Sequence, residues 1–293
     1  MKQNLFVRDG RPLVSKVAYE GNLKESIGLS VSLIGGIKKL VKKGDIILLK
    51  PNYNTADPYP GSSDPEFIKA VIDMLYESGA GKVIVGERTA FLHSRKVLEQ
   101  AGIVKVAEEA GAEVRVFGKD GWHAIFDRKG WRRTKVPGGQ YLHKVSLAKE
   151  ATEIDKIVYV PLIKTHHAAE FTGSIKLSMG FVKPFFDQIT FHARHLQEKL
   201  AELSLVVKPD LIIMDARKVF ITGGPAKGEL REPNLILASG NQVAIDVEGV
   251  KILQSYSGHS LKDKNVWDLM QIRHAVKLGL GPHSEEGYEV IMS

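Results

Sequence analysis

Four short apolar runs, each ending on a charged or hydrogen-bonding residue, constrain the fold of this chain more than any other feature. The runs are residues 46–49, 83–86, 157–160 and 211–214, and they are rich in Val, Ile and Leu. Continuous apolar runs of this length, bounded by turn residues, are typical of strands buried on both faces, as in parallel sheets. We therefore predict an α/β protein with a mainly parallel central sheet flanked by helices.

The segments around these runs complete the expected architecture. Shorter runs predict strands at 114–117 and 235–238, and helical spacing predicts helices over 24–43, 64–79, 97–110, 192–207, 243–253 and 265–278, with a broken helix over 174–181. Residues 118–150 interrupt the pattern with two Trp, paired glycines and no clear period. We predict a single domain over 1–293 with a small insertion or subdomain at 118–150.

The composition excludes several classes of protein. The chain has no cysteine, which rules out disulfides, a thiolate nucleophile and a cysteine-ligated zinc or iron–sulfur cluster. Lys and Arg number 41 against 34 Asp and Glu, an excess that favours anionic partners. No segment has the apolar core of a signal peptide or a membrane span. We expect a cytoplasmic protein without a membrane partner, and the oligomeric state stays open.

Polar side chains follow each of the four apolar runs. They are Lys50 and Asn52, Glu87, Lys164 and His166, and Asp215. In open parallel sheets, ligands bind in the crevice beyond the carboxyl ends of the strands. We therefore expect these side chains to gather at one edge of the sheet as a candidate site.

Two of these stretches have the chemistry of an anion site. Lys50 offers a compact ammonium for phosphate or carboxylate, and Asn52 can orient either group, although a structural turn is an equal alternative. Residues 164–176 hold two lysines, two histidines and three hydroxyls. There, Lys164 and Lys176 can neutralise an anion, and Thr172 can orient it at a helix start. His166 fits either a metal ligand or a general acid or base.

Carboxylates and glycines add two further predictions. Glu87 or Asp215 alone fits a cap or an ion pair, but together, near His166, they can bind a divalent cation. Gly223 and Gly224 predict a tight loop that allows the backbone to approach a ligand. Asp246, by contrast, fits a helix-capping role best. Of His166 and the adjacent His167, at most one is expected to enter the site.

Read in order, these stretches resemble the family catalogued as domain of unknown function three-six-two. The matching stretches are residues 49–52, 82–87, 161–166, 172–180, 210–215, 223–228 and 244–246. Members usually have Lys-Asn where this chain has Lys176-Leu177, so a role of that Asn does not carry over. Many relatives carry ferredoxin-like cysteine clusters. Because this chain has no cysteine, that feature of the family does not carry over to it. No settled reaction comes with the family.

These observations favour an enzyme or cofactor-handling protein that binds a phosphorylated or carboxylated small molecule, with a divalent metal as an optional cofactor. In this interpretation His166 and Lys164 are the catalytic candidates. The sequence does not decide whether the chain is an enzyme. One alternative is a nucleic-acid-binding protein that uses the basic stretch 128–135, where Trp131 lies among cations, although a solvated hairpin fits that stretch better. Another is a non-catalytic scaffold for metallocofactor assembly.

Overall fold

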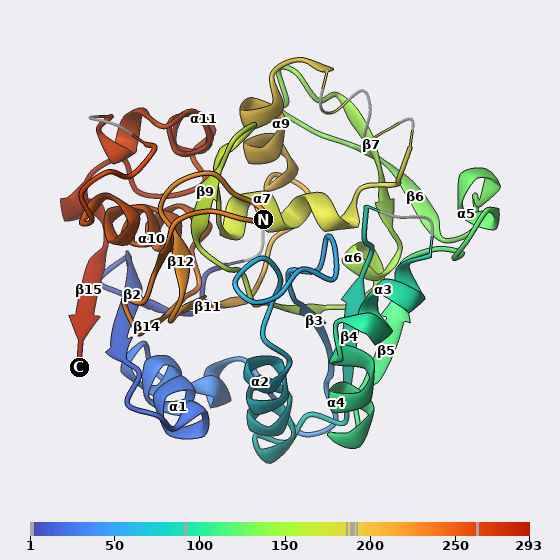
Figure 1. Cartoon of the computed structure of the whole chain (residues 1–293), viewed down its shortest axis with the longest axis horizontal. Coiled ribbons are helices and arrows are strands. Elements are labelled where there is room, and N and C mark those ends of the chain that lie inside the picture. Colours follow the sequence, from blue (N-terminus) through green and yellow to red (C-terminus); the bar gives the residue numbers. More distant parts are fainter. Residues whose placement is uncertain (1–2, 91–92, 186, 188–190, 192, 262–263) are drawn as a thin grey trace.

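A nine-stranded sheet forms the centre of the molecule in the computed structural model, which describes residues 3–90, 93–185, 187, 191, 193–261 and 264–293 (Figure 1). In spatial order the strands are β1 (Val7–Arg8), β2 (Arg11–Ala18), β14 (Leu235–Ser239), β11 (Leu211–Ala216), β8 (Lys156–Tyr159), β3 (Ile46–Lys50), β4 (Lys82–Glu87) and β5 (Glu113–Val116), with β15 (Glu289–Met292) beside β2.

Five neighbouring strands of this sheet, β11, β8, β3, β4 and β5, run parallel to one another. β14 is antiparallel to both β11 and β2. The prediction of an α/β protein with a mainly parallel sheet is therefore confirmed. The sequence did not reveal β2 or β15. β2 escapes a search for continuous apolar runs because Ser15, at its centre, is polar yet fully buried, and its hydroxyl donates to the carbonyl of Ser30 at 2.7 Å.

Helices cover both faces of the sheet (Figure 1). α1 (Leu23–Leu33), α2 (Pro65–Glu77) and α4 (Ile103–Glu109) cover one face, where Ile47 and Leu49 of β3 are buried. α7 (Ser174–Leu177), α9 (Leu196–Leu203), α10 (Gln242–Gln254) and α11 (Met270–Lys277) cover the other, where Leu48 is buried. Successive side chains of a strand point to opposite faces, so one continuous apolar run supplies two cores.

Glycines account for most differences between the predicted and observed helices. α2 begins as predicted, with the Asp64 carboxylate accepting from the amide of Glu66 at 3.1 Å. The helix predicted over 24–43 is instead α1 followed by the short η1 (Ile37–Lys39), because Gly35 and Gly36 have φ of 115° and 87°. Gly102, with φ of 77°, divides the helix predicted over 97–110 into α3 (Ser94–Gln100) and α4.

The remaining helices and short hairpins belong to the C-terminal half of the chain. The broken helix is α7 followed by η2 (Ser178–Phe181), and α9 occupies part of the helix predicted over 192–207, whose first residue, His192, lies outside the described residues. The short hairpins are β9 (Lys164–His166) with β10 (Glu170–Thr172), and β12 (Val219–Phe220) with β13 (Leu230–Arg231). Two short helices, η3 (Val266–Asp268) and η4 (Glu285–Gly287), lie near the end of the chain.

Across the part of the chain that the structure describes, no helix has the length and apolar character needed to cross a membrane.

The segment at 118–150 projects from the side of the sheet that carries β5 (Figure 1). It contains the helical turn α5 (His123–Phe126) and an antiparallel hairpin of β6 (Trp131–Lys135) and β7 (Lys144–Ala148), and it leads into α6 (Glu150–Glu153). Trp131 is buried and belongs to the same apolar cluster as Val145, Leu147 and Leu48 of the central sheet. This shared core supports the proposal of a single domain with an insertion. Because Trp131 is buried, its ring is not available to stack on a nucleic-acid base.

Candidate functional site

Two cavities that share a wall lie beyond the carboxyl ends of β3 and β4. The larger has a volume of about 190 Å³ and the smaller of about 70 Å³. Both are lined by Asn52, Asn54, Thr172 and Lys176. Pockets for drug-sized ligands usually measure ~300–1,000 Å³, so these volumes suit a small ligand.

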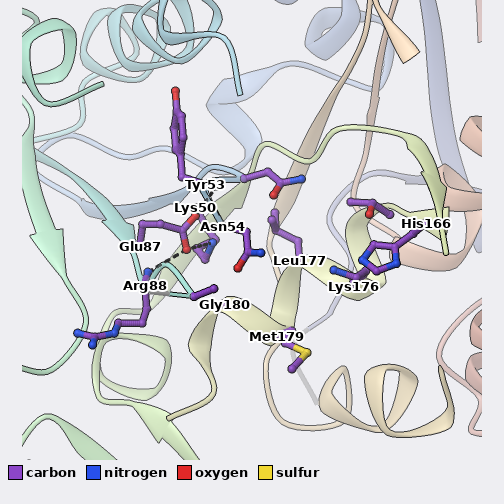
Figure 2. Close-up of a pocket in the computed structure, with 13 residues that line it drawn as sticks. Lys50, Tyr53, Asn54, Glu87, Arg88, His166, Lys176, Leu177, Met179 and Gly180 are labelled. Atoms are coloured by element: carbon purple, nitrogen blue, oxygen red, sulfur yellow. Dashed lines mark hydrogen bonds and ion pairs between the residues drawn. The ribbon is translucent and has the colours of Figure 1, made fainter. Parts of the chain in front are cut away.

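A buried ion pair forms one end of the larger cavity (Figure 2). Lys50, the last residue of β3, places its Nζ 2.5 Å from Oε1 of Glu87, the last residue of β4. Glu87 also accepts from the amides of Tyr53 and Arg88, both at 2.9 Å. Burial lowers the pKa of Lys50 and raises the pKa of Glu87, while the opposite charge of each partner counteracts both shifts. A Cβ on Gly180 would lie 2.6 Å from Cε of Lys50, so the pair needs a glycine there.

Lys164 faces the smaller cavity from β9. Its buried Nζ donates to the carbonyls of Pro60 and Gly61 at 2.9 and 2.5 Å. Both carbonyls belong to the long loop after β3, which therefore wraps around this lysine. Among the described residues no carboxylate lies within ion-pair distance of Lys164. Burial, and then the charge of Lys176, lower the pKa of Lys164 to about 7.

Lys176 lines both cavities from the short helix α7. Burial, with a smaller contribution from the charge of Lys50, lowers the pKa of Lys176 to about 8. Within the described part of the chain, its ammonium has no carboxylate partner. Figure 2 shows it beside the ring of His166, at the end of the larger cavity opposite the Lys50–Glu87 pair.

The rings of the two adjacent histidines stack, with their centroids 5.0 Å apart. Only His166 lines the larger cavity, and Nδ1 of His167 lies 2.9 Å from the carbonyl oxygen of Gly224. Nδ1 of His166 accepts from the amides of Ala168 and Ala169 at 3.1 and 3.3 Å. Because a backbone N–H can only donate, Nδ1 is the acceptor and the proton of a neutral His166 ring is on Nε2.

Two buried donors on the shared wall have no partner within the described residues. They are Nδ2 of Asn52 and Oγ1 of Thr172. Buried polar groups are nearly always hydrogen-bonded, so such a pair on the wall of a cavity indicates a partner from outside the chain. Together with Lys176, they form a set of donors that suits the oxygens of an anion.

The structure does not bring Asp215 to either cavity. Its carboxylate accepts two bonds from the guanidinium of Arg217, at 2.9 and 2.7 Å, and one from the hydroxyl of Tyr59 at 2.9 Å. Tyr59 lies in the same long loop after β3, so Asp215 fixes that loop from outside. A divalent cation shared by Asp215 and Glu87 would have to displace both of their basic partners. No group of three His, Asp or Glu side chains is arranged to hold a metal ion among the residues that the structure describes.

Gly223 and Gly224 also lie outside the cavity walls. Both have positive φ, 69° and 67°, and a Cβ on Gly224 would lie 1.8 Å from the carbonyl oxygen of Thr165. Gly224 thus allows close approach to β9, whereas the next two residues, Pro225 and Ala226, line the smaller cavity.

Sequence reasoning missed several residues at the larger cavity. Asn54, Arg88 and Met179 line it, and Gly180 accommodates the ion pair. The guanidinium of Arg88 points away from Lys176 (Figure 2), and its Nη1 donates to the carbonyl of Lys119 at 2.8 Å. Position in the sequence could have indicated Arg88, because it directly follows Glu87 at the end of β4.

Asp246 of α10 holds the start of α7, the helix that carries Lys176. Its fully buried carboxylate accepts from the amides of Ser174 and Ile175 at 2.6 and 2.8 Å. The capping role predicted for Asp246 is therefore present, although the capped helix is α7 and not its own. Burial raises the pKa of Asp246 to about 7.

We expect Asp246→Asn to change how stability depends on pH. Between about pH 4 and 7 the folded state keeps the Asp246 proton that the unfolded chain has lost. The free energy of unfolding that Asp246 contributes is thus fully present below pH 4 and declines as the pH rises to 7. Denaturant unfolding across this range should show a smaller decline in Asp246→Asn than in the wild type. Equal slopes in the two proteins would contradict the assignment.

Comparison with known proteins gives a family and a fold. A family model described as Domain of unknown function (DUF362) matches residues 47–251. A thylakoid-associated protein of Synechocystis sp. is 30% identical over 252 residues, which cover 83% of this chain and 74% of that protein.

Two solved structures resemble the fold at low sequence identity. A Thermotoga maritima protein aligns with a TM-score of 0.50 and 12% identity, and the lactate racemase apoprotein of Thermoanaerobacterium thermosaccharolyticum aligns with 0.42 and 11%. The alignments cover 79% and 86% of this chain but only 59% and 58% of those structures. The first supports the α/β fold.

Proposed function

Because this chain belongs to the family Domain of unknown function (DUF362), whose description carries no activity, we propose a function from its own cavities: it binds a small molecule through a phosphate or carboxylate group. The observation that carries the proposal is Lys176. Its ammonium is partly buried and has no carboxylate partner among the described residues, and such a charge is costly unless an anion from outside accompanies it. Lys176 lines both cavities, so one ligand can reach it from either side.

The surrounding groups divide into donors and supports. Asn52 and Thr172 offer unpartnered donors beside Lys176, and Lys164 offers its third N–H to the smaller cavity. The Lys50–Glu87 pair is internally neutralised and sets the shape of the larger cavity. His166, with its proton on Nε2, is positioned to donate to the ligand or to exchange a proton with it. The proposal thus includes a proton-transfer role for His166 but no metal.

The double variant Lys164→Ala plus His166→Ala should lose ligand binding while keeping the fold. The measurement is a thermal-shift screen of phosphorylated and carboxylated small molecules, among them inorganic phosphate and pyrophosphate, with circular dichroism as the check on folding. Loss is expected because the variant removes one cation and one proton donor from the same two cavities.

Nδ1 of His166 also orders the following turn by accepting from the amides of Ala168 and Ala169. His166→Asn is therefore the matched control, because the side-chain oxygen of Asn can still accept from these amides. Shifts of equal size in the wild type and in the double variant would count against the proposal. So would a screen in which no compound stabilises the wild type.

The two other functions considered for this chain receive less support. A nucleic-acid site at 128–135 loses the aromatic ring on which it depended, since Trp131 is 7% exposed. A scaffold for metallocofactor assembly would predict stable co-purification with a cluster protein and no small-molecule shift, so the same screen separates it from the anion-binding function.

A further inference from the structure

The positive charge of this protein is concentrated in one projecting segment. Residues 118–150 contain eight basic and three acidic side chains, a net charge of +5 out of +7 for the whole chain. The other 260 residues are therefore close to neutral. None of these basic side chains lines the two cavities, so the segment has a charge that the proposed anion site does not use.

The same segment exposes two large aromatic side chains at its end. Trp122 is 69% exposed and Phe126 is 83% exposed, both in or beside the helical turn α5. Trp122 has helical dihedral angles, so the two residues, four apart, lie on the same side of this turn. We call this pair the aromatic tip. Figure 1 shows α5 at the periphery of the molecule, away from the central sheet.

The base of the tip is held firmly by buried polar contacts. Asp127 is 4% exposed and accepts from the amides of Lys119 and Lys129, both at 2.9 Å. The Nζ of Lys183 donates to the carbonyl of Asp127 at 2.6 Å, and Arg88 binds the carbonyl of Lys119. These contacts fix the backbone at the base of the aromatic tip, so the fold itself sets where the two rings lie.

The surface beside the tip is cationic because its carboxylates turn inward. Asp120 accepts from the amides of Ser94 and Arg95 at 2.8 and 2.9 Å, and Asp127 is buried. Lys119, Arg128 and Lys129, which flank α5 in the sequence, are all exposed. Within the described residues, none of these three side chains forms an ion pair with Asp120 or Asp127, so their charged groups face solvent.

We infer that the aromatic tip docks on the surface of an anionic lipid bilayer, with Trp122 and Phe126 at the boundary between headgroups and acyl chains. Peripheral membrane segments combine an apolar face of this kind with flanking Lys and Arg that attract anionic headgroups. A single-stranded nucleic acid would instead require rings placed along a basic groove, and the ring within the basic stretch, Trp131, is buried. Contact of this kind needs no membrane-spanning helix.

The test is co-sedimentation of the full chain with phosphatidylcholine vesicles, with and without phosphatidylglycerol. We expect binding to the phosphatidylglycerol vesicles that weakens with salt. Trp122→Ser plus Phe126→Ser, and separately Arg128→Glu plus Lys129→Glu, should each weaken it at least about tenfold. All four side chains are exposed, so the thermal midpoint should not change.

Matched controls lie elsewhere on the surface. Leu230→Ser plus Met292→Ser removes two exposed apolar side chains, and Lys38→Glu plus Lys43→Glu makes the same change in net charge. Both should retain binding. The inference is overturned if the vesicles are not bound, if the controls weaken binding as much as the tip variants, or if the tip variants lose affinity for a single-stranded RNA but not for vesicles. Tip variants should keep the small-molecule response, so this test is independent of the proposed function.

Discussion

Replacing Lys176 with Met is expected to abolish stabilisation by the anion and, at the same time, to raise the stability of the ligand-free protein. Met keeps most of the apolar length of Lys but carries no charge. The ligand would lose a charge-assisted hydrogen bond, which corresponds to about a 10- to 100-fold loss of affinity. The ligand-free protein would no longer hold a partly buried ammonium that has no carboxylate partner among the described residues, which costs on the order of 1–3 kcal/mol. Thermal denaturation with and without inorganic phosphate, or with another compound that stabilises the wild type, measures both effects.

The opposite signs of these two changes make the experiment specific. A residue with only a structural role would lower the thermal midpoint of the ligand-free protein when replaced. Lys43→Met, at an exposed position, is the matched control and should change neither quantity. A Lys176→Met protein that keeps its response to the anion would show that Lys176 does not contact the ligand.

Replacing Glu87 with Gln is expected to cause the largest loss of stability among these variants. The substitution preserves the volume of the side chain but leaves the ammonium of Lys50, which is 1% exposed, without its counter-charge. Breaking a buried ion pair on one side typically costs about 3–5 kcal/mol. Denaturant unfolding should show this decrease in the free energy of unfolding.

A double-mutant cycle identifies the cause. Lys50→Met in the Glu87→Gln background removes the stranded charge and should recover part of the lost stability, because an apolar replacement for both charges is often tolerated. Glu77→Gln, in the exposed pair that Glu77 forms with Lys24 at 2.6 Å, is the control and should have no resolvable effect. If the double variant is no more stable than Glu87→Gln, the loss of stability comes instead from the hydrogen bonds that Glu87 accepts from two backbone amides.

The edge of the sheet that holds the site follows from sequence pattern alone. Lys50 and Glu87 come together because their strands are parallel neighbours and end at the same edge. Thr172 and Lys176 also reach the cavities, as expected for the stretch after β8. Asp215 lies one residue before the end of β11, but an arginine two residues later binds its carboxylate. No strand pattern reveals which cation an acid will contact.

Local sequence therefore determined the strands of the parallel part of the sheet and the residue types available at its edge, because apolar runs and turn residues act through the nearest neighbours in the chain; it did not determine β2 or β15. Tertiary structure decided which of those charges are neutralised by a partner. Lys50 and Lys176 are the same residue type beside the same cavity, yet among the described residues only Lys50 has a carboxylate partner. That difference depends on contacts between distant segments, such as Lys50 with Glu87, and on how deeply each is removed from water.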